Sequence, residues 1–265
     1  MRMNMRERLS QIGLWIRDLL FPPQCVGCGE ALPPARPEEG IFCPVCRNQW
    51  EKDRTEARLS MGGVLPEALS VGGCSRHLCL TTYHPGRPQG VSERLIYHIK
   101  RNDDRKVFDY LANTAVPYLV EAFPDVPMDR IWFTYAPRRR WAVVCHGVDQ
   151  SEQLAKTLAR ATGGTAVSVF RRHGGKEQKK LTATQRRKNV AATFFLKEEY
   201  RDAVVGKTVV LVDDLLTTGA TLGVCSTILA SAGASEIVAL TVARTVEREA
   251  PERKKQRKRL RRRKK

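Results

Sequence analysis

The stretch VVLVDDLLTTGAT at residues 209–221 decides how the chain is interpreted. Its first four residues are apolar, which predicts a strand buried on both faces of a parallel sheet. Asp213 and Asp214 then follow at the C-terminal end of that strand, where open α/β sheets bind ligands. The small-residue loop enters a helix near Gly219, so its N–H groups and threonine hydroxyls can hold a phosphate. The alternative is a buried strand whose aspartates only cap a helix.

Strand and helix patterns alternate on both sides of this stretch. Expected strands cover residues 76–83, 131–135, 165–170, 192–196, 208–212 and 236–242. Expected helices cover residues 5–20, from about 92, 105–121 with Pro117 kinking or ending it, from Asp149 to about 162, and from Gly219 to about 232. Residues 51–72 are weakly patterned and are interpreted as a connector. Strand–helix–strand units at this spacing predict a parallel sheet covered by helices.

Two C-x-x-C pairs precede this region, Cys25 with Cys28 and Cys43 with Cys46. Each pair presents two thiolates on a tight turn, and the 14 residues between the pairs allow a hairpin to bring them together. Four thiolates favour a tetrahedral, structural zinc ion, with an iron–sulfur cluster or free thiols as alternatives.

Four more cysteines lie outside these pairs. Cys74 and Cys79 are five residues apart on an expected strand, so they should face opposite sides, which argues against a shared ion. A second metal site that includes His77 and His84 is the alternative. Cys145 and Cys225 are interpreted as buried small apolar residues.

The charge of the chain is concentrated at one end. There are 46 Lys and Arg residues against 28 Asp and Glu, and residues 251–265 alone hold eleven basic residues and one acid. Such a segment is expected to be disordered and to suit an acidic partner, most simply nucleic acid, or to be a solubilising end. The candidate nucleic-acid contacts are Arg257, Lys258, Arg259, Arg261, Arg262 and Arg263. No apolar run is long enough to span a membrane and no signal peptide is visible, so a cytoplasmic location is expected.

Residues 209–221 resemble the phosphoribosyl-pyrophosphate (PRPP) motif of type I phosphoribosyltransferases, and the wider chain resembles the ComF competence-protein family. The supporting segments are LLFPP at 19–23, LIYHIK at 95–100, GVDQSEQL at 147–154 and LTATQRRKNV at 181–190. The resemblance implies an α/β fold with a parallel sheet flanked by helices and a small N-terminal zinc ribbon. The expected units are a helix and zinc ribbon at 1–60, a phosphoribosyltransferase-like domain at 74–246, and a basic tail at 251–265.

The resemblance also implies a set of site residues. Asp213 and Asp214 would bind the ribose hydroxyls, and Mg²⁺ would accompany PRPP. The 5′-phosphate would lie on Thr217, Thr218, Gly219, Ala220 and Thr221. Pro137, Arg138 and Arg139 would lie where pyrophosphate binds, and residues 171–180 where the family has a mobile flap; a solvated basic turn and a plain surface loop are the alternatives. Where the family has Arg-Gly-Phe-Asn-Gln, residues 146–150 read HGVDQ, which lacks the arginine and the aromatic residue.

Three functions follow from these expectations. As a ComF relative, the protein would assist single-stranded DNA import together with a competence helicase, and its phosphate loop would bind PRPP or a related ligand. As an enzyme, it would be a Mg²⁺-dependent phosphoribosyltransferase that displaces pyrophosphate from PRPP. As a structural protein, it would be a nucleic-acid-binding ribbon on a scaffold domain. The sequence identifies no acceptor base and leaves the oligomeric state open, a homodimer included.

Overall fold

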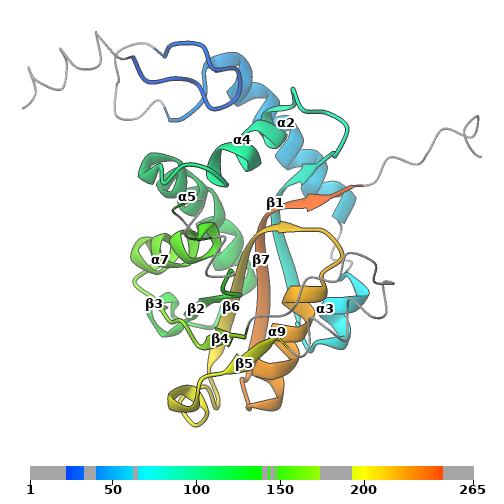
Figure 1. The fold of residues 1–265 in the computed structure, drawn as a ribbon, viewed down its shortest axis with the longest axis vertical. Helices are drawn as coiled ribbons and strands as arrows, with labels where there is room; N and C mark the ends of the chain where they lie inside the picture. Colours follow the sequence, from blue (N-terminus) through cyan, green and yellow to red (C-terminus); the bar gives the residue numbers. More distant parts are fainter. Residues whose placement is uncertain are drawn as a thin grey trace, which may run out of the picture.

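A parallel sheet forms the centre of the molecule. The structure, a computed structural model, describes residues 22–32, 40–61, 65–138, 143, 147, 149–173 and 193–246. The sheet has five strands in the order β1-β7-β6-β2-β3, and every pair is parallel (Figure 1). Their bounds are Arg76–Tyr83 for β1, Trp132–Tyr135 for β2, Thr165–Ala166 for β3, Thr208–Leu216 for β6 and Glu236–Thr245 for β7. The last strand in the described part of the chain, β7, therefore lies inside the sheet, between β1 and β6.

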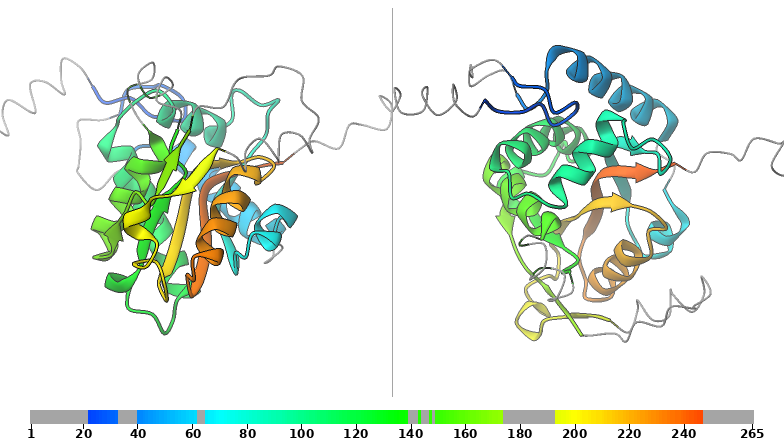
Figure 2. Two further views of the ribbon diagram at one scale, coloured as in Figure 1. Left: turned by 60° about the horizontal axis from the view of Figure 1, so that its bottom comes forward. Right: turned by 45° about the horizontal axis from the view of Figure 1, so that its top comes forward.

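Helices cover both faces of the sheet (Figure 2). The described α-helices are α2 (Pro44–Met61), α3 (Glu67–Val71), α4 (Val91–Ile99), α5 (Arg105–Ala122), α7 (Gln150–Thr162) and α9 (Ala220–Ser231); short 3-10 turns span Met128–Arg130 and Glu198–Tyr200. Val210 and Val212 of β6 pack into one buried cluster with α4, α5 and α7. Val209 and Leu211 pack into a second cluster with α3 and α9. The apolar run of β6 is thus buried on both faces, as the sequence predicts.

The prediction that residues 51–72 form a connector is wrong, because most of these residues are helical. Helix α2 continues to Met61, and α3 follows at Glu67–Val71. Only a narrow stripe of α2 is fully buried, formed by Trp50 and Ala57. Charged side chains occupy the other faces of α2, so its apolar periodicity is too weak to recognise in the sequence.

Pro117 does not end its helix. Helix α5 runs on to Ala122, and Leu119 beyond the proline is fully buried. The proline removes an N–H that would otherwise bond the carbonyl of Asn113, four residues earlier. Both Asn113 and Pro117 are exposed, so water can satisfy that carbonyl while the buried face of the helix continues.

The strands expected at 165–170 and 192–196 differ in the structure. The strand expected at 165–170 gives only the short β3, and Phe170–Arg172 forms β4, which pairs antiparallel with β5 (Phe194–Leu196) in a separate two-stranded sheet. Val169 and Phe170 are buried in the second cluster, beside residues of β5 and α9. Burial of these two side chains draws the chain away from the main sheet after β3.

The cysteine segment shares its core with the sheet. Cys25, Phe42 and Cys46 belong to the same buried cluster as side chains of α5 and β2. The Phe42 ring lies 5.7 Å from both the Trp50 ring of α2 and the Tyr110 ring of α5. The buried core is therefore continuous between the cysteine segment and the sheet. We keep the expected boundaries at 1–60, 74–246 and 251–265 as a proposed division of the sequence. In the described part of the chain, no helix has the length and apolar character needed to cross a membrane.

Candidate active site and metal centre

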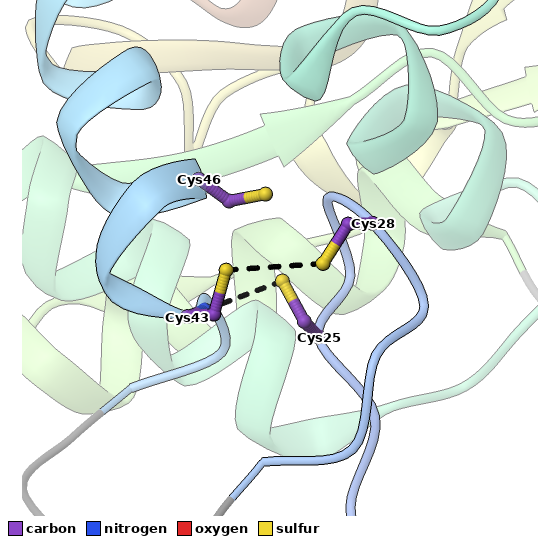
Figure 3. A group of neighbouring side chains, drawn as sticks. All are labelled: Cys25, Cys28, Cys43 and Cys46. Carbon is purple, nitrogen blue, oxygen red and sulfur yellow. Dashed lines mark hydrogen bonds between the residues drawn. The ribbon is translucent and has the colours of Figure 1, made fainter.

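The four cysteines of the C-x-x-C pairs converge at one point (Figure 3). Their sulfur atoms all lie within 4.8 Å of one another, and Cys28 Sγ lies 3.8 Å from Cys43 Sγ. A tetrahedral zinc ion with bonds of about 2.3 Å separates its sulfur ligands by about 3.8 Å. The four sulfurs therefore fit one zinc ion that leaves no coordination position open, which is typical of a structural site.

We call the loop with Cys25 and Cys28, together with Cys43 and Cys46, the cysteine knuckle. Its local geometry brings the two segments together. Cys25 and Cys28 lie in a loop closed by a bridge between Gln24 and Ala31, while Cys46 lies in the first turn of α2. A Cβ atom added at Gly27 would lie 2.7 Å from Cys46 Sγ, so only glycine allows the two cysteine segments to approach this closely.

Backbone hydrogen bonds stabilise the thiolate form of Cys25, which is the form that binds metal. The backbone N–H of Cys43 donates to Cys25 Sγ at 3.2 Å. Burial would raise the pKa of the Cys25 thiol, but backbone hydrogen bonds from Cys43, Cys28 and Gly27 outweigh it and lower the pKa to about 7. Burial and the neighbouring thiols raise the pKa of Cys46. A bound cation lets all four sulfurs carry charge together, because it compensates their mutual repulsion.

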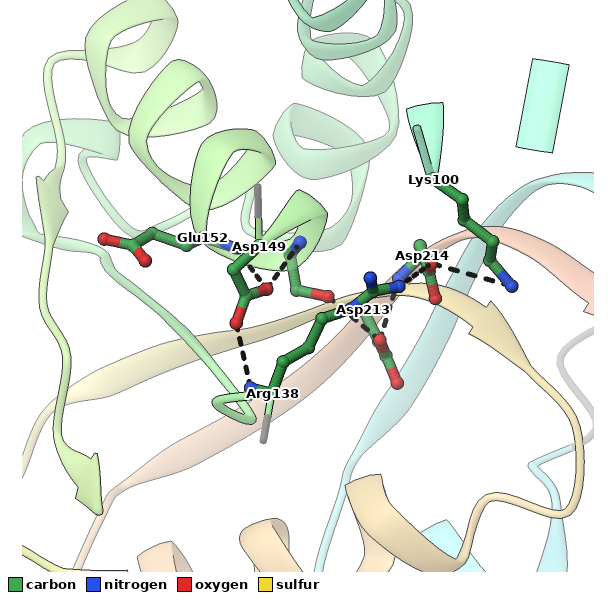
Figure 4. A network of polar contacts seen from close by, with 7 residues as sticks. Lys100, Arg138, Asp149, Glu152, Asp213 and Asp214 are labelled. Carbon is green, nitrogen blue, oxygen red and sulfur yellow. Dashed lines mark hydrogen bonds and ion pairs between the residues drawn. The ribbon is translucent and has the colours of Figure 1, made fainter. Parts of the chain in front are cut away.

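The paired carboxylates lie at the C-terminal end of β6 (Figure 4). Asp213 Oδ1 accepts hydrogen bonds from Ser151 Oγ at 3.0 Å and from the Asp214 N–H at 2.9 Å. Asp214 Oδ2 lies 3.3 Å from Arg138 Nη2 and 3.8 Å from Lys100 Nζ. Side chains from three segments distant in sequence therefore meet at the two aspartates.

Among the described residues, Asp214 has cationic partners and Asp213 has none. Burial, and then the charge of Asp214, raise the pKa of Asp213 to about 7. A hydroxyl-rich or cationic ligand at this position would compensate the charge that the protein itself leaves uncompensated.

The loop after the carboxylates leads directly into α9. Thr217 and Thr218 are exposed, and Gly219 is buried with φ +72°, a conformation that favours glycine. The carbonyl of Gly219 accepts the Gly223 N–H at 2.7 Å, which closes the first turn of α9. The positive end of a 12-residue helix thus opens beside two carboxylates, with two hydroxyls exposed at its entrance.

The loop after β2 is tied to the same place. Asp149 caps α7 by accepting the Ser151 N–H at 3.2 Å, and its other oxygen accepts the Arg138 N–H at 2.9 Å. Asp149 stands in the segment that departs from the ComF pattern, and here it anchors Arg138. On the other side, Arg172 Nη1 donates to the Pro137 carbonyl at 3.3 Å. These contacts hold Arg138 toward Asp214.

Comparison with known proteins gives a match that includes the carboxylate pair. Residues 146–262 match the family described as the phosphoribosyl transferase domain. The chain contains a phosphoribosyltransferase-like domain. The match and the parallel sheet confirm the expected phosphoribosyltransferase fold, and the four-cysteine cluster is compatible with the expected small zinc site. No curated protein matches the chain.

Similar solved structures are distant from this chain. The allosteric regulatory enzyme of purine biosynthesis is 23% identical with a TM-score of 0.37, over 57% of this chain and 30% of that enzyme. A protein from Thermus thermophilus is 21% identical with a TM-score of 0.30, over 58% and 78%. A purine phosphoribosyltransferase from Pyrococcus horikoshii is 17% identical with a TM-score of 0.28, over 52% and 88%. This chain thus spans less than a third of the length of the purine-biosynthesis enzyme.

Three contributors to the candidate site of the phosphoribosyltransferase-like domain escaped the sequence analysis. Lys100 ends the LIYHIK segment, but nothing local indicates that it reaches Asp214. Ser151 lies next to a recognisable helix cap, yet its bond to Asp213 joins residues 62 positions apart. Helix α3 supports the phosphate loop, since the Ala68 Cβ would lie 3.3 Å from a Cβ added at Gly219. Only the resemblance of residues 95–100 to ComF proteins offered a signal for Lys100.

Several predicted positions lie outside the described residues. These are Arg139, Cys145, residues 174–180 of the expected flap, the helix expected at 5–20 and the basic tail at 251–265. Cys74 and Cys79 are described, and neither joins the four-cysteine cluster. Cys225 is fully buried, as predicted. A cavity of about 340 Å³ between α2, β1 and α5 does not include the carboxylate pair.

The raised pKa of Asp213 predicts a pH-dependent stability. A carboxyl whose pKa is about 7 in the folded chain, against 3.8 ordinarily, destabilises the fold as pH rises from about 4 through about 7. Asp213→Asn should therefore leave the free energy of unfolding almost unchanged near pH 4 and raise it by about 1–3 kcal/mol near pH 8. Urea unfolding of both proteins at the two pH values measures this difference. An equal effect at both pH values would show that charge at Asp213 is not the cause.

Proposed function

We propose that this protein binds PRPP with Mg²⁺ and displaces its pyrophosphate. One observation carries the proposal: two carboxylates at the end of a buried central strand lie directly before the loop and N-terminus of α9. The carboxylates suit ribose hydroxyls, and the loop suits a phosphate group. The family match of residues 146–262 supports the same assignment.

The charges of the site support a division of roles. Asp213 and Asp214 would accept hydrogen bonds from the ribose hydroxyls, which fixes the sugar ring. Residues 217–221 would hold the 5′-phosphate at the end of α9. Pro137, Arg138 and Arg139 would lie along the pyrophosphate. Mg²⁺, when bound with the pyrophosphate, supplies positive charge that makes it a better leaving group.

These contacts would act on the reacting carbon through charge. As the bond to pyrophosphate breaks, C1 of the ribose becomes oxocarbenium-like, and the nearby carboxylates stabilise the positive charge. The Arg138 guanidinium stabilises the negative charge that develops on the leaving group. The acceptor then attacks C1 from the opposite face.

A binding titration followed by an assay of turnover tests the proposal. PRPP with Mg²⁺ should stabilise the native protein by about 2.7 kcal/mol when present at about 100 times its dissociation constant. Pyrophosphate release should then be measured with a panel of nucleobases. No thermal shift with PRPP at any Mg²⁺ concentration would refute the binding site, whereas binding without release would limit the protein to a PRPP-binding role.

We propose nucleic-acid handling in DNA uptake, with single-stranded DNA and a competence helicase as partners, as a second function. It rests on the ComF resemblance and on the eleven basic residues at 251–265. A tail engaging six phosphates should contribute a log–log salt slope of about 4 to single-stranded DNA binding. Deleting residues 251–265 should remove most of that slope and leave PRPP binding unchanged. An unaltered slope would refute a role for the tail.

A further inference from the structure

Helix α4 connects the cysteine knuckle to the carboxylate pair. Near its start, Arg94 Nη1 donates a hydrogen bond to the Gly27 carbonyl at 2.8 Å, inside the loop that holds Cys25 and Cys28. Directly after its end, Lys100 Nζ lies 3.8 Å from Asp214 Oδ2 (Figure 4). One helix of nine residues thus contacts the metal centre at one end and the candidate active site at the other.

Buried contacts fix the position of this helix. Leu95 and Ile99 are almost fully buried in the core cluster that also contains Cys25 and Cys46. Ser92 Oγ donates to Asp53 Oδ2 of α2 at 2.8 Å.

The first turn of α4 is also held by β1 and the turn that follows it. Ser92 Oγ lies 2.8 Å from Thr81 Oγ1, and the buried Glu93 accepts the His84 N–H at 2.6 Å. Because α4 is held along its length, its packing on α2 and the knuckle decides where Lys100 lies.

Asp214 has two cationic partners, although one is enough to compensate the charge of a single carboxylate. Arg138 and Lys100 both contact its Oδ2 atom, at 3.3 and 3.8 Å, and Lys100 remains 36% exposed. When the carboxylate accepts ribose hydroxyls, at least one of these cations is available to an anionic group of the same ligand. Arg138 already belongs to the candidate pyrophosphate loop, and Lys100 contacts the same Oδ2 atom of Asp214, so Lys100 is placed to reach the same anionic group.

We propose that Lys100 binds the pyrophosphate moiety of the phosphoribosyl donor and that the zinc knuckle positions Lys100 through Arg94 and α4. The inference rests on the proposed function and adds a ligand-binding residue and a positioning residue to it. Arg94 touches no ligand in this scheme, because it acts by holding α4 against the Gly27 carbonyl.

Calorimetric titrations of the zinc-loaded full chain with three ligands test the role of Lys100. The ligands are PRPP and pyrophosphate, each with Mg²⁺, and ribose 5-phosphate. Lys100→Gln should weaken pyrophosphate and PRPP binding about tenfold, the effect of losing one charge-assisted contact, and leave ribose 5-phosphate binding within about twofold. Lys100→Arg should restore much of the affinity. Arg101→Gln is the matched control, because the Arg101 guanidinium lies over the Tyr97 ring, 3.9 Å from its centroid.

The same titrations test the positioning role of Arg94. Arg94→Ala should weaken pyrophosphate binding several-fold while the zinc content stays at one ion per chain. A merely structural role would lower the affinity for ribose 5-phosphate equally, so the ratio of the two affinities is the decisive readout. Arg87→Ala, an exposed arginine in the turn before α4, is the control and should leave both affinities unchanged.

The outcomes separate this inference from the proposed function. If the wild-type protein binds PRPP and Lys100→Gln binds pyrophosphate as tightly as wild type, the role of Lys100 is overturned and the PRPP site stands. If Arg94→Ala keeps the wild-type ratio of affinities, positioning by the knuckle is overturned. If the wild-type protein binds neither PRPP nor pyrophosphate, both the inference and the proposed function fail.

Discussion

Cys28→Ser protein is expected to contain no zinc and to melt about 10 °C or more below the wild type. Cys28 is only half-buried, so the substitution removes a metal ligand with little loss of packing. The expected effect is large because binding of structural zinc contributes directly to folding. Elemental analysis and calorimetry of anaerobically purified protein measure both quantities.

The buried cluster that contains Cys25 and Cys46 predicts which helices lose stability when the metal is lost. Cys25 and Cys46 pack in one cluster with α4 and α5, whereas α3 and α9 pack in the other. Amide hydrogen exchange should therefore accelerate first in α2, α4 and α5 of the Cys28→Ser protein. Cys74→Ser is the matched control, because Cys74 is buried outside the metal cluster and its loss should leave one zinc ion bound. One zinc ion retained by Cys28→Ser would contradict the four-thiolate site.

Gly219→Val should lower PRPP affinity by about a hundredfold or more and destabilise the fold by about 1–3 kcal/mol. Gly219 has φ +72°, a conformation that a β-branched residue avoids, and an added Cβ would lie 3.3 Å from the Ala68 Cβ. The loop must therefore shift, and its N–H groups would no longer converge on one phosphate. Titration with PRPP and Mg²⁺ and a urea unfolding curve measure the two effects.

Gly206 provides a control for backbone strain alone. It has φ +70° and no atom within 4 Å of an added Cβ, and it lies before β6, away from the carboxylate pair. Gly206→Val should lower the free energy of unfolding by a similar amount and keep wild-type affinity for PRPP. Equal losses of affinity in both variants would assign the effect to stability and not to the phosphate loop.

The parts of the fold that were predictable are those with strong local patterns. β1 covers the residues predicted for it, and Asp149 and Gly163 cap α7 as their residue types indicate. The C-x-x-C spacing predicted a cluster that the structure brings together. Each of these features depends on residues close together in the sequence or on a spacing with few geometric solutions.

The parts that were missed depend on tertiary packing. Helix α2 buries only a narrow stripe, so its helical character is set by contacts with β1 and α5 that no local window contains. The strand expected at 165–170 divides because Val169 and Phe170 find burial away from the main sheet. In the candidate site, Lys100 approaches Asp214 across more than a hundred residues. Such pairings follow from the arrangement of elements and leave no mark on the neighbouring sequence.

The position of β7 has a consequence for synthesis on the ribosome. β7 is the last strand of the main sheet to be translated, yet it pairs with both β1 and β6. Until Thr245 has emerged, β1 has no partner in the main sheet, and the edge of β6 that pairs with β7 is exposed. A nascent chain in this state is prone to aggregate and suits chaperone binding. Messages truncated before residue 236 should accordingly yield insoluble or rapidly degraded products, even though they encode the whole carboxylate pair and phosphate loop.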